Sequence, residues 1–277
     1  MRPDGLGITT ALDALRLYGA EITVHGRSML VRTDSNPYFH NGNLVLSDWP
    51  AGSAELTLFE QEFPYATHRT LWINGDLPAP AFSHADFSGG DLPGGDAFGH
   101  GLRLESTLTM SATASATGAA PPGRIPAVGH GRLLESDGDW LALAAQRCAD
   151  TGTTAEADDD GARFCRTQTR LEHGISRRNQ GAGCGWFVDG ALVASLILLR
   201  LPADRARVEA VMTDPAHRRQ GIAAALLGLA MAHARTYWRT ELFVLDAEPD
   251  GPAAGIYRRL GFTDAGWVTS LTGENIR

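Results

Sequence analysis

The sequence predicts an α/β fold, in the form of an α+β arrangement with a mixed sheet, spread over two domains. A length of 277 residues with 43% hydrophobic side chains is enough for two buried cores. The segment 185–199 places apolar strands around Asp189-Gly190, a pair that supplies the positive φ angles of a tight hairpin turn. Residues 207–233 then change from a strand pattern to an Ala- and Leu-rich helical pattern at Gly221.

The first 110 residues predict a smaller mixed α/β domain. The expected helix, hairpin and three further strands cover 8–17, 21–32, 44–46, 70–73 and 102–110. His25, His40 and His68 could line a pocket together with nearby aromatic residues. Their spacing fits no metal motif, and scattered residues of this kind are more often half-buried packing groups, which is the interpretation we favour.

A stretch of small residues separates the two predicted domains. Residues 111–123 are rich in Ala, Thr and Pro and cannot bury a core, so they predict a linker between domains 1–110 and 124–277. The second domain shows alternating helical and strand patterns. The expected order is helix 139–148, helix 164–179, hairpin 185–199, strand 207–213, helix 222–233, strand 241–245, a further helix and a final strand near 267–271.

Composition excludes several classes of protein. The chain contains no Lys, which excludes a Walker-type phosphate loop and Schiff-base chemistry, and its formal net charge of -8 argues against a nucleic-acid partner. Cys148, Cys165 and Cys184 form no CxxC pair, so we expect no metal site and a reducing compartment. Because no apolar run could span a membrane and residues 1–5 lack the apolar core of a secretion signal, we expect no membrane partner and a cytoplasmic location.

The junction between the strand at 207–213 and the helix at 222–233 has the character of a phosphate site. Gly221 lacks a Cβ, so its backbone can come close to a bulky anion, and the next amides belong to the unsatisfied first turn of the helix. Arg218 and Arg219 add positive charge beside these donors in an otherwise acidic chain. A glycine in such a turn is common for geometric reasons alone, so a second motif is needed.

That second motif follows the next predicted strand. Arg218-Arg219-Gln220-Gly221-Ile222-Ala223 resembles the R/Q-x-x-G-x-G/A pyrophosphate loop of the GNAT N-acetyltransferases, and Ala253 to Phe262 resembles their later A-x-x-x-Y-x-x-x-G-F signature. The two motifs stand in the order and separation of the family, each after a strand and with a helix between them. The resemblance covers the last half of the chain and implies a GNAT-like acyl-CoA N-acyltransferase fold for 124–277.

The first half resembles the same family less closely. Val31-Arg32-Thr33, Asn36-Pro37 and Gly42-Asn43 look similar to the degenerate first half of tandem GNAT proteins, and residues 80–87 are faintly similar to residues 257–262. No counterpart of the 218–223 loop is present. The resemblance implies a degenerate GNAT repeat that holds no acyl-CoA and shapes the acceptor side or an interface. A dimerisation element is the alternative.

The resemblance also implies acetyl-CoA as the cosubstrate. The loop amides would hold the pyrophosphate and the end of the preceding strand would lie along the pantetheine arm, through Val211, Met212, Thr213, Arg218, Arg219, Gln220, Gly221, Ile222, Ala223 and Ala224. Asp250 stands where many members carry Asn; its carboxylate can cap the following helix but cannot donate a hydrogen bond. Tyr257 stands where the family often carries the acid that protonates the leaving thiolate, or it only closes the side of the CoA tunnel.

Candidates for a general base lie on the strands before and after the predicted loop helix. Glu209 is the best placed to take a proton from an acceptor ammonium, directly or through water, although an outward strand Glu is usually only a surface residue. Asp246 is a second candidate that the sequence cannot rank against Glu209. Cys184 has no His in a sequence-readable relation to it and is not expected to act as a nucleophile.

These assignments predict an N-acetyltransferase that moves an acetyl group from acetyl-CoA directly to an amine in a ternary complex. The acceptor, a small-molecule or peptide amine, is not identified by the sequence. A homodimer is one expectation for the oligomeric state. The alternative function is a catalytically silent acyl-CoA-binding or regulatory module, in which Tyr257 only packs.

Overall fold

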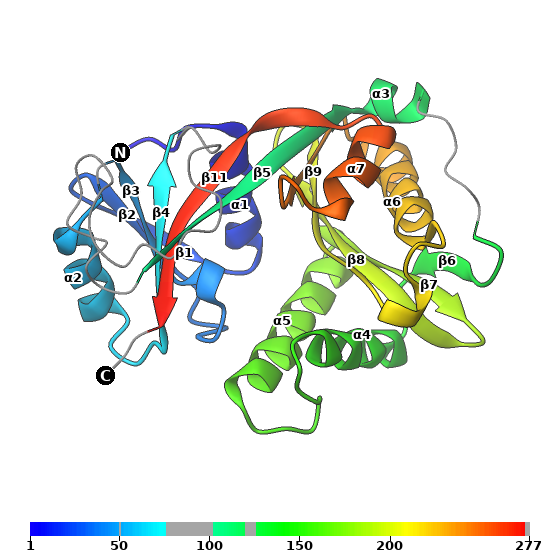
Figure 1. Ribbon diagram of the computed structural model, residues 1–277, viewed down its shortest axis with the longest axis horizontal. Helices are drawn as coiled ribbons and strands as arrows, with labels where there is room; N and C mark the ends of the chain where they lie inside the picture. The colour runs from blue at the N-terminus through cyan, green and yellow to red at the C-terminus, as the bar shows by residue number, and fades with distance from the viewer. Residues whose placement is uncertain (50, 76–101, 120–125, 275–277) are drawn as a thin grey trace. The chain divides into compact units, whose positions relative to one another are not determined.

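The computed structural model describes residues 1–49, 51–75, 102–119 and 126–274, and the chain divides into two compact units. Unit 1 comprises Met1–Thr109 and Ala265–Arg277, and unit 2 comprises Met110–Asp264. Figure 1 labels the helices and strands of each. Both units combine helices with a mixed sheet, which confirms the predicted fold class.

Unit 1 places a parallel strand pair, β3 and β4, beside antiparallel neighbours. Its elements are α1 (Leu6–Leu17), β1 (Glu21–His25), β2 (Ser28–Arg32), η1 (His40–Gly42), β3 (Leu44–Asp48), α2 (Ser53–Glu62) and β4 (His68–Asn74), with the first part of β5 (Arg103–Thr113) and the second part of β11 (Thr263–Glu274). The strand order in this unit is β1-β2-β3-β4-β11-β5. Strand β2 runs antiparallel to both β1 and β3, β3 and β4 are parallel, and β11 runs antiparallel to β4.

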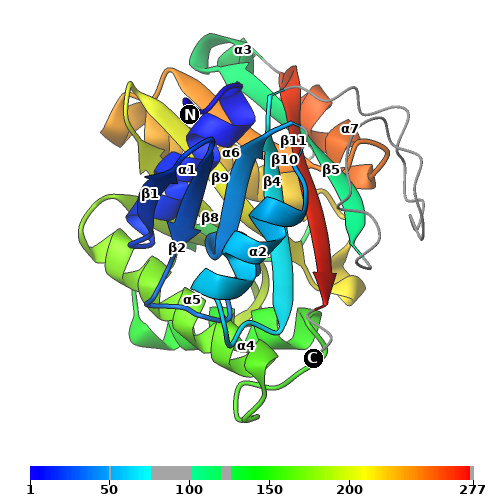
Figure 2. The same cartoon turned by 90° about the vertical axis from the view of Figure 1, so that its left-hand side faces the viewer.

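Helix α2 covers one face of the unit 1 sheet, as Figure 2 shows. Its Leu56 and Phe59 pack into a buried cluster with Leu71 of β4 and apolar residues of the other strands. Helix α1 lies on the opposite face. Gly7 of α1 approaches β5 so closely that a Cβ there would lie 2.2 Å from Oγ1 of Thr109, which explains the small residue at that position.

Unit 2 carries the segment in which the motifs were found. Its elements are α3 (Ala114–Ala119), β6 (His130–Leu133), α4 (Asp137–Asp150), α5 (Asp160–Arg177), β7 (Gly181–Val188), β8 (Ala191–Leu201), β9 (Arg205–Thr213), η4 (Pro215–His217), α6 (Ile222–His233), η5 (Ala234–Trp238), β10 (Leu242–Ala247) and α7 (Pro252–Arg259). The strand order is β5-β10-β9-β8-β7-β6. Strands β6 to β9 are antiparallel to one another, whereas β9 and β10 are parallel.

Helices α4 and α5 lie on one face of the unit 2 sheet and α6 lies on the other (Figure 1). A Cβ on Gly183 of β7 would meet Trp140 of α4 at 2.8 Å, so this glycine lets the helix pack closely. Gly183 is in register with Ile197 of β8, and Ile197 is in register with Glu209 of β9. Because residues in register share a face, Glu209 points to the α4 and α5 side of the sheet.

The structure differs from the predicted linker. Residues 111–113 continue β5 and residues 114–119 form α3, whereas 120–123 lie outside the described residues. The N–H of Ala114 donates to the carbonyl of Glu241 at 2.8 Å, and Oγ1 of Thr113 accepts from the N–H of Ala116 at 3.2 Å. These hydrogen bonds outweigh the lack of apolar side chains on which the linker prediction rested.

The predicted boundary 124–277 also differs from the observed division, because residues 265–277 belong to unit 1. Strand β11 pairs with β4 from Thr269 opposite Ile73 to Glu274 opposite His68. A strand pattern indicates that a strand exists, but not which neighbour it pairs with. The similarity noted for residues 80–87 lies outside the described residues. Within the described part of the chain, no helix is long and apolar enough to cross a membrane.

Candidate active site

The loop between β9 and α6 presents a row of backbone donors. Gly221 is the N-cap residue of α6 and has a left-handed backbone with φ 84°, and Arg219 also has a positive φ of 63°. The first backbone hydrogen bond of the helix runs from the N–H of Ala225 to the carbonyl of Gly221 at 3.0 Å. Among the described residues, no acceptor is found for the amides of residues 219–224. Such a row of donors at a helix N-terminus suits an anion.

The side chains of the loop add positive charge and hold its shape. Nε of Arg218 donates to the carbonyl of Thr213 at 2.9 Å, which ties the loop to the end of β9. Nε2 of Gln220 donates to the carbonyl of Ala216 at 3.3 Å. In the described part of the chain, no acidic side chain forms an ion pair with Arg218. Arg218, Arg219 and Gln220 are all exposed, so the loop offers its guanidinium groups to solvent.

The parallel strands β9 and β10 separate beside this loop. Their register begins with Leu242 opposite Arg205 and ends with Val244 opposite Arg207, although β9 continues to Thr213 and β10 to Ala247. Over its last part β9 stays paired with β8, through residues 212 and 213. Its other edge, which includes the predicted residues Val211, Met212 and Thr213, is therefore left open to an extended partner.

A bulge in β9 lies between the paired and the open part. Glu209 is opposite Ile197 and Met212 is opposite Ser195, so two residues of β9 stand against one of β8. The bulged residue Ala210 has a positive φ of 51°. A bulge bends a strand and re-aims its side chains. Here it directs the chain away from β10 directly after Glu209.

The two candidate bases are held by one arginine. Arg207 is buried, and its Nε donates to Oε1 of Glu209 at 2.5 Å while its Nη2 donates to Oδ2 of Asp246. Burial opposes the charge of Arg207, but the carboxylates of Asp246 and Glu209 outweigh it and raise the pKa of Arg207 above its ordinary value. The sequence prediction missed Arg207. Its position two residues before Glu209, on the same strand face, was the available signal.

A second buried ion pair joins helices α4 and α5. Nη1 and Nη2 of Arg147 (α4) each donate to the carboxylate of Glu172 (α5) at 3.0 Å, and Gln168 donates to the same group at 3.4 Å. Burial raises the pKa of Glu172, with Arg147 acting against the rise and the charge of Glu209 adding to it. Glu209 points to the side of the sheet on which α4 and α5 lie, so this pair and the arginine-held carboxylates share one face of the sheet. Neither Arg147 nor Glu172 was predicted, since each pairs with a partner on another helix.

Tyr257 lies in α7, with its ring centroid 6.1 Å from that of Phe262. Only 6% of the residue is exposed, and burial raises the pKa of its phenol, so the hydroxyl stays protonated at neutral pH. The cap considered for Asp250 is not formed. The N-cap of α7 is Gly251, without a side-chain hydrogen bond, and Asp250 is exposed.

All three cysteines are buried. Burial raises the pKa of the Cys184 thiol to about 12, so the thiolate is scarce at neutral pH. This finding agrees with the prediction for Cys184. In the described residues no group of His, Cys, Asp and Glu has the arrangement of a metal site.

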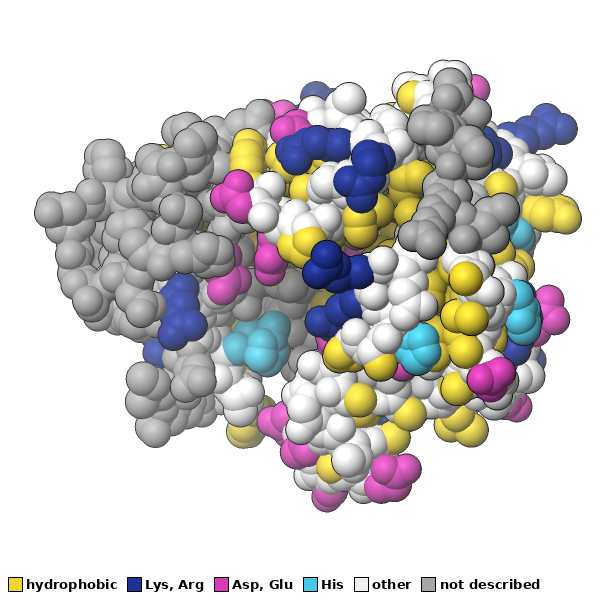
Figure 3. Space-filling model, turned by 45° about the vertical axis from the view of Figure 1, so that its right-hand side comes forward, with side chains coloured by type: hydrophobic (Ala, Val, Ile, Leu, Met, Phe, Trp, Pro, Cys, Tyr) yellow, Lys and Arg dark blue, Asp and Glu magenta, His cyan; other side chains and the backbone are white. Residues whose placement is uncertain are grey.

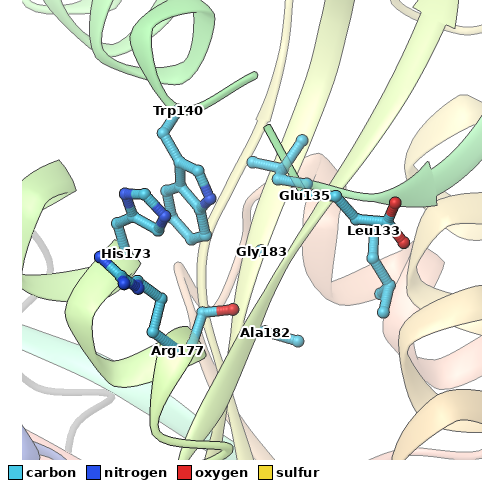
Figure 4. A pocket seen from close by; sticks show the side chains of 9 residues that line it. Leu133, Glu135, Trp140, His173, Arg177, Ala182 and Gly183 are labelled. Carbon is cyan, nitrogen blue, oxygen red and sulfur yellow. The ribbon is translucent and has the colours of Figure 1, made fainter. Parts of the chain in front are cut away.

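A hollow of about 250 Å³ opens between β6, β7 and the two helices of the same face (Figure 4). His173 and Trp140 stack on one side of it, with ring centroids 4.9 Å apart and Arg177 nearby. Ala182 and Gly183 form its sheet wall. Gly183 lies two strands from Glu209, with a buried residue of β8 between them, so this hollow is distinct from the arginine-held carboxylates.

Unit 1 has a separate pocket of about 540 Å³. Its lining includes His40 and His68, whose rings stack with centroids 3.9 Å apart, together with Arg69 and Arg103. Burial and the neighbouring His40 lower the pKa of His68 to about 4, so that ring is neutral. The packing interpretation therefore holds for His68, which is buried, whereas His25 and His40 are exposed and His40 lines the pocket together with His68.

Surface charge is unevenly distributed on the face drawn in Figure 3. Arginine side chains gather there in several groups, while acidic side chains lie mostly around them. An acidic protein can thus present local positive charge to an anionic ligand.

Comparison with known proteins identifies the family of this domain. The sequence model of the Acetyltransferase (GNAT) family matches residues 149–262, which include the loop, the separated strands and Tyr257. The domain formed by residues 149–262 belongs to the GNAT family. Membership in this family of acetyltransferases assigns the chain to acyl transfer. A search of the curated proteins found no match.

Several solved structures share the fold of this GNAT chain over almost its whole length. A GCN5-related N-acetyltransferase from Kribbella flavida is 18% identical, covers 99% of this chain and 97% of its own, and has a TM-score of 0.59. A tandem GNAT protein from the clavulanic acid biosynthesis pathway is 13% identical over 90% of this chain and 83% of its own, with a TM-score of 0.56. A functionally unknown conserved protein from Staphylococcus epidermidis is 12% identical over 92% and 93%, with a TM-score of 0.61. At such identities the likeness shows the fold alone, and its coverage includes unit 1.

Proposed function

We propose that the protein is an N-acetyltransferase that moves an acetyl group from acetyl-CoA directly to an amine. The observation that carries this proposal is the row of amides at 219–224, which lack acceptors among the described residues and stand beside the separated edge of β9. The amides and the two arginines suit a pyrophosphate. The open edge of residues 211–213 suits the amide groups of a pantetheine arm.

The reaction joins an amine nitrogen to the acetyl carbon and breaks the carbon–sulfur bond. A substrate amine that arrives as an ammonium first loses a proton. Glu209 or Asp246 is the group of this chain that takes this proton. The departing thiolate gains a proton. Tyr257 is suited to supply it, because its buried phenol is protonated at neutral pH.

The runner-up function is a catalytically silent module that binds acyl-CoA. One observation favours it: the Tyr257 ring packs on Phe262, and no hydrogen bond of its hydroxyl is found among the described residues. Under this alternative the loop binds the nucleotide and Tyr257 only closes the side of the site. Acetyl-CoA binding is common to both functions, so only turnover separates them.

The first experiment measures acetyl-CoA binding to the full chain by calorimetry, followed by release of free thiol with a panel of amines. Binding together with thiol release supports the enzyme, and binding without thiol release for any amine supports the silent module. Absence of binding would contradict both.

Tyr257→Phe tests the proton donor. The ring still packs on Phe262, but the hydroxyl is lost, so we expect kcat to fall by about ten- to a hundredfold while the affinity for acetyl-CoA stays the same. Steady-state kinetics and calorimetry give the two values. An unchanged kcat would leave Tyr257 with packing alone.

A further inference from the structure

We propose that Arg207 is a positioning residue, which holds Glu209 and Asp246 together as one carboxylate pair, and that this pair receives the cationic amine of the acceptor. The inference rests on the proposed function and adds the charge class of the substrate. Glu209 and Asp246, which the sequence analysis treated as alternative bases, act together in this inference.

The strand register brings the three side chains together. Arg207 and Val244 are the last residues paired between β9 and β10. Glu209 and Asp246 each lie two residues further on, so both point to the same face as Arg207. They flank the place where the two strands part, and the guanidinium spans the gap between the strands by bonding to both carboxylates. A planar group with several fixed donors can bridge two carboxylates in this way.

Exposure shows which side of the cluster faces a ligand. The Arg207 side chain is 5% exposed, whereas those of Glu209 and Asp246 are 32% and 21% exposed. The positive charge therefore lies beneath the two negative charges. A ligand that enters between the strands meets carboxylate oxygens first.

Two ion-paired groups of described residues determine the charge around the pair. Arg147 and Glu172, the ion pair on α4 and α5, balance each other. Arg207 balances one of the two carboxylates, so the side chains of Arg207, Glu209 and Asp246 together carry one net negative charge. An acceptor bearing an ammonium compensates that charge, whereas an anionic acceptor is repelled.

The arginine also fixes where the two carboxylates lie. Its guanidinium donates to Oε1 of Glu209 and to Oδ2 of Asp246, so the two groups stand side by side across the gap between β9 and β10. The arginine thus gives the carboxylates their position without itself touching the reacting atoms.

The test measures binding of 1,4-diaminobutane to the full chain by calorimetry in the presence of CoA. We expect the wild-type protein to bind it, and Glu209→Gln and Asp246→Asn each to weaken binding by about tenfold. Glu241→Gln is the matched control, because this exposed carboxylate precedes the start of β10, at the far end of the strand from Asp246. No binding by the wild-type protein, or binding unchanged in both carboxylate variants, would overturn the inference.

Arg207→Met decides whether the arginine positions the pair or only offsets its charge. If it only offsets charge, its removal makes the site more negative and the diamine binds more tightly. A positioning role predicts the opposite, binding weakened by about tenfold, with Arg207→Lys between wild type and Arg207→Met because an ammonium lacks the planar fork. Tighter binding in Arg207→Met would contradict positioning. Retained acetyl-CoA binding shows that a variant is folded, and the two carboxylate variants test the pair if Arg207→Met does not fold.

These measurements separate the inference from the function on which it rests. Acetyl-CoA binding and thiol release test the proposed function, whereas diamine binding is read without turnover. A protein that consumes acetyl-CoA with an uncharged amine and does not bind the diamine would keep the function and lose the inference.

Discussion

Two strand–helix–strand segments, β3-α2-β4 in unit 1 and β9-α6-β10 in unit 2, have the same parallel topology and opposite local structures. In unit 1 the strands stay paired to the end, with Asp48 opposite Asn74. In unit 2 pairing ends at Arg207, and six further residues of β9 continue without β10. A parallel strand pair joined by a helix therefore does not by itself provide the open strand edge on which the proposed pantetheine site depends.

The N-termini of α2 and α6, the helices that join these strands, also differ, because only the first is capped by a side chain. At α2, Oε2 of Glu55 accepts from the N–H of Gly52 at 2.8 Å, and this carboxylate is buried. At α6, the corresponding end carries exposed arginines and no capping side chain. A carboxylate satisfies a donor and repels a phosphate, whereas arginines leave the donors available and attract one. We call the N-terminus of α2, which the Glu55 carboxylate caps, the closed end, and the N-terminus of α6 at residues 218–224 the open end.

The largest effect is expected from reversing the charge of the open end. The double change Arg218→Glu and Arg219→Glu places carboxylates where α2 has one, and we expect the affinity for acetyl-CoA to fall by at least about a hundredfold. Calorimetry on the full chain measures this. Arg27→Glu is the matched control, since Arg27 approaches Glu55 in unit 1 at 3.4 Å. An equal loss of affinity in the control would mean that the two ends do not differ as described.

A smaller effect is expected where a carboxylate closes a helix of unit 2. Asp139 of α4 accepts from both Nη1 and Nη2 of Arg132 at 2.7 Å and from the N–H groups of Glu135 and Ser136. Asp139→Asn should lower the free energy of unfolding by about 2 kcal/mol at pH 7 and leave acetyl-CoA binding unchanged. Urea unfolding and calorimetry give the two values.

The same variant has a defined pH dependence. Hydrogen bonds from Arg132 lower the pKa of Asp139, although burial opposes them. A lowered pKa stabilises the folded protein above the unfolded value of about 4, and this contribution is lost as the pH falls through the folded value. The difference in unfolding free energy between wild type and Asp139→Asn should therefore be full at pH 7 and shrink below pH 4. A difference that grows with acid would refute this sign.

The open end could be predicted from the sequence because its signals are local. Gly221 marks a left-handed turn, the arginines precede it, and the helical pattern follows at once, so no distant residue was needed. The second motif at 253–262 confirmed its family, and the family match includes both.

The arginine-held pair and the division into units could not be predicted in this way. Contact between Arg207 and Asp246 depends on the register of two strands that are far apart in the chain, and sequence patterns do not fix register. The pairing of β11 with β4 of unit 1 could not be predicted for the same reason, since the alternation of side chains along β11 is compatible with any neighbouring strand. For unit 1, the sequence indicated only that the loop motif at 218–223 has no counterpart. In the structure, the carboxylate of Glu55 caps the N-terminus of α2, the helix at the corresponding place.

The smallest effects come from alanine in place of single glycines. At Gly221, φ is 84°, a region that costs an L-residue about 1 kcal/mol, so Gly221→Ala should destabilise the protein and weaken acetyl-CoA binding. Gly228, in the interior of the same helix, has open space around it, and Gly228→Ala should stabilise by up to about 1 kcal/mol. Gly52 begins α2 with a negative φ of -152°, which any residue can adopt, so Gly52→Ala should have little effect. Urea unfolding of the three variants therefore gives a loss, a gain and no change. Equal losses at Gly52 and Gly221 would show that the left-handed turn does not distinguish the open end from the closed one.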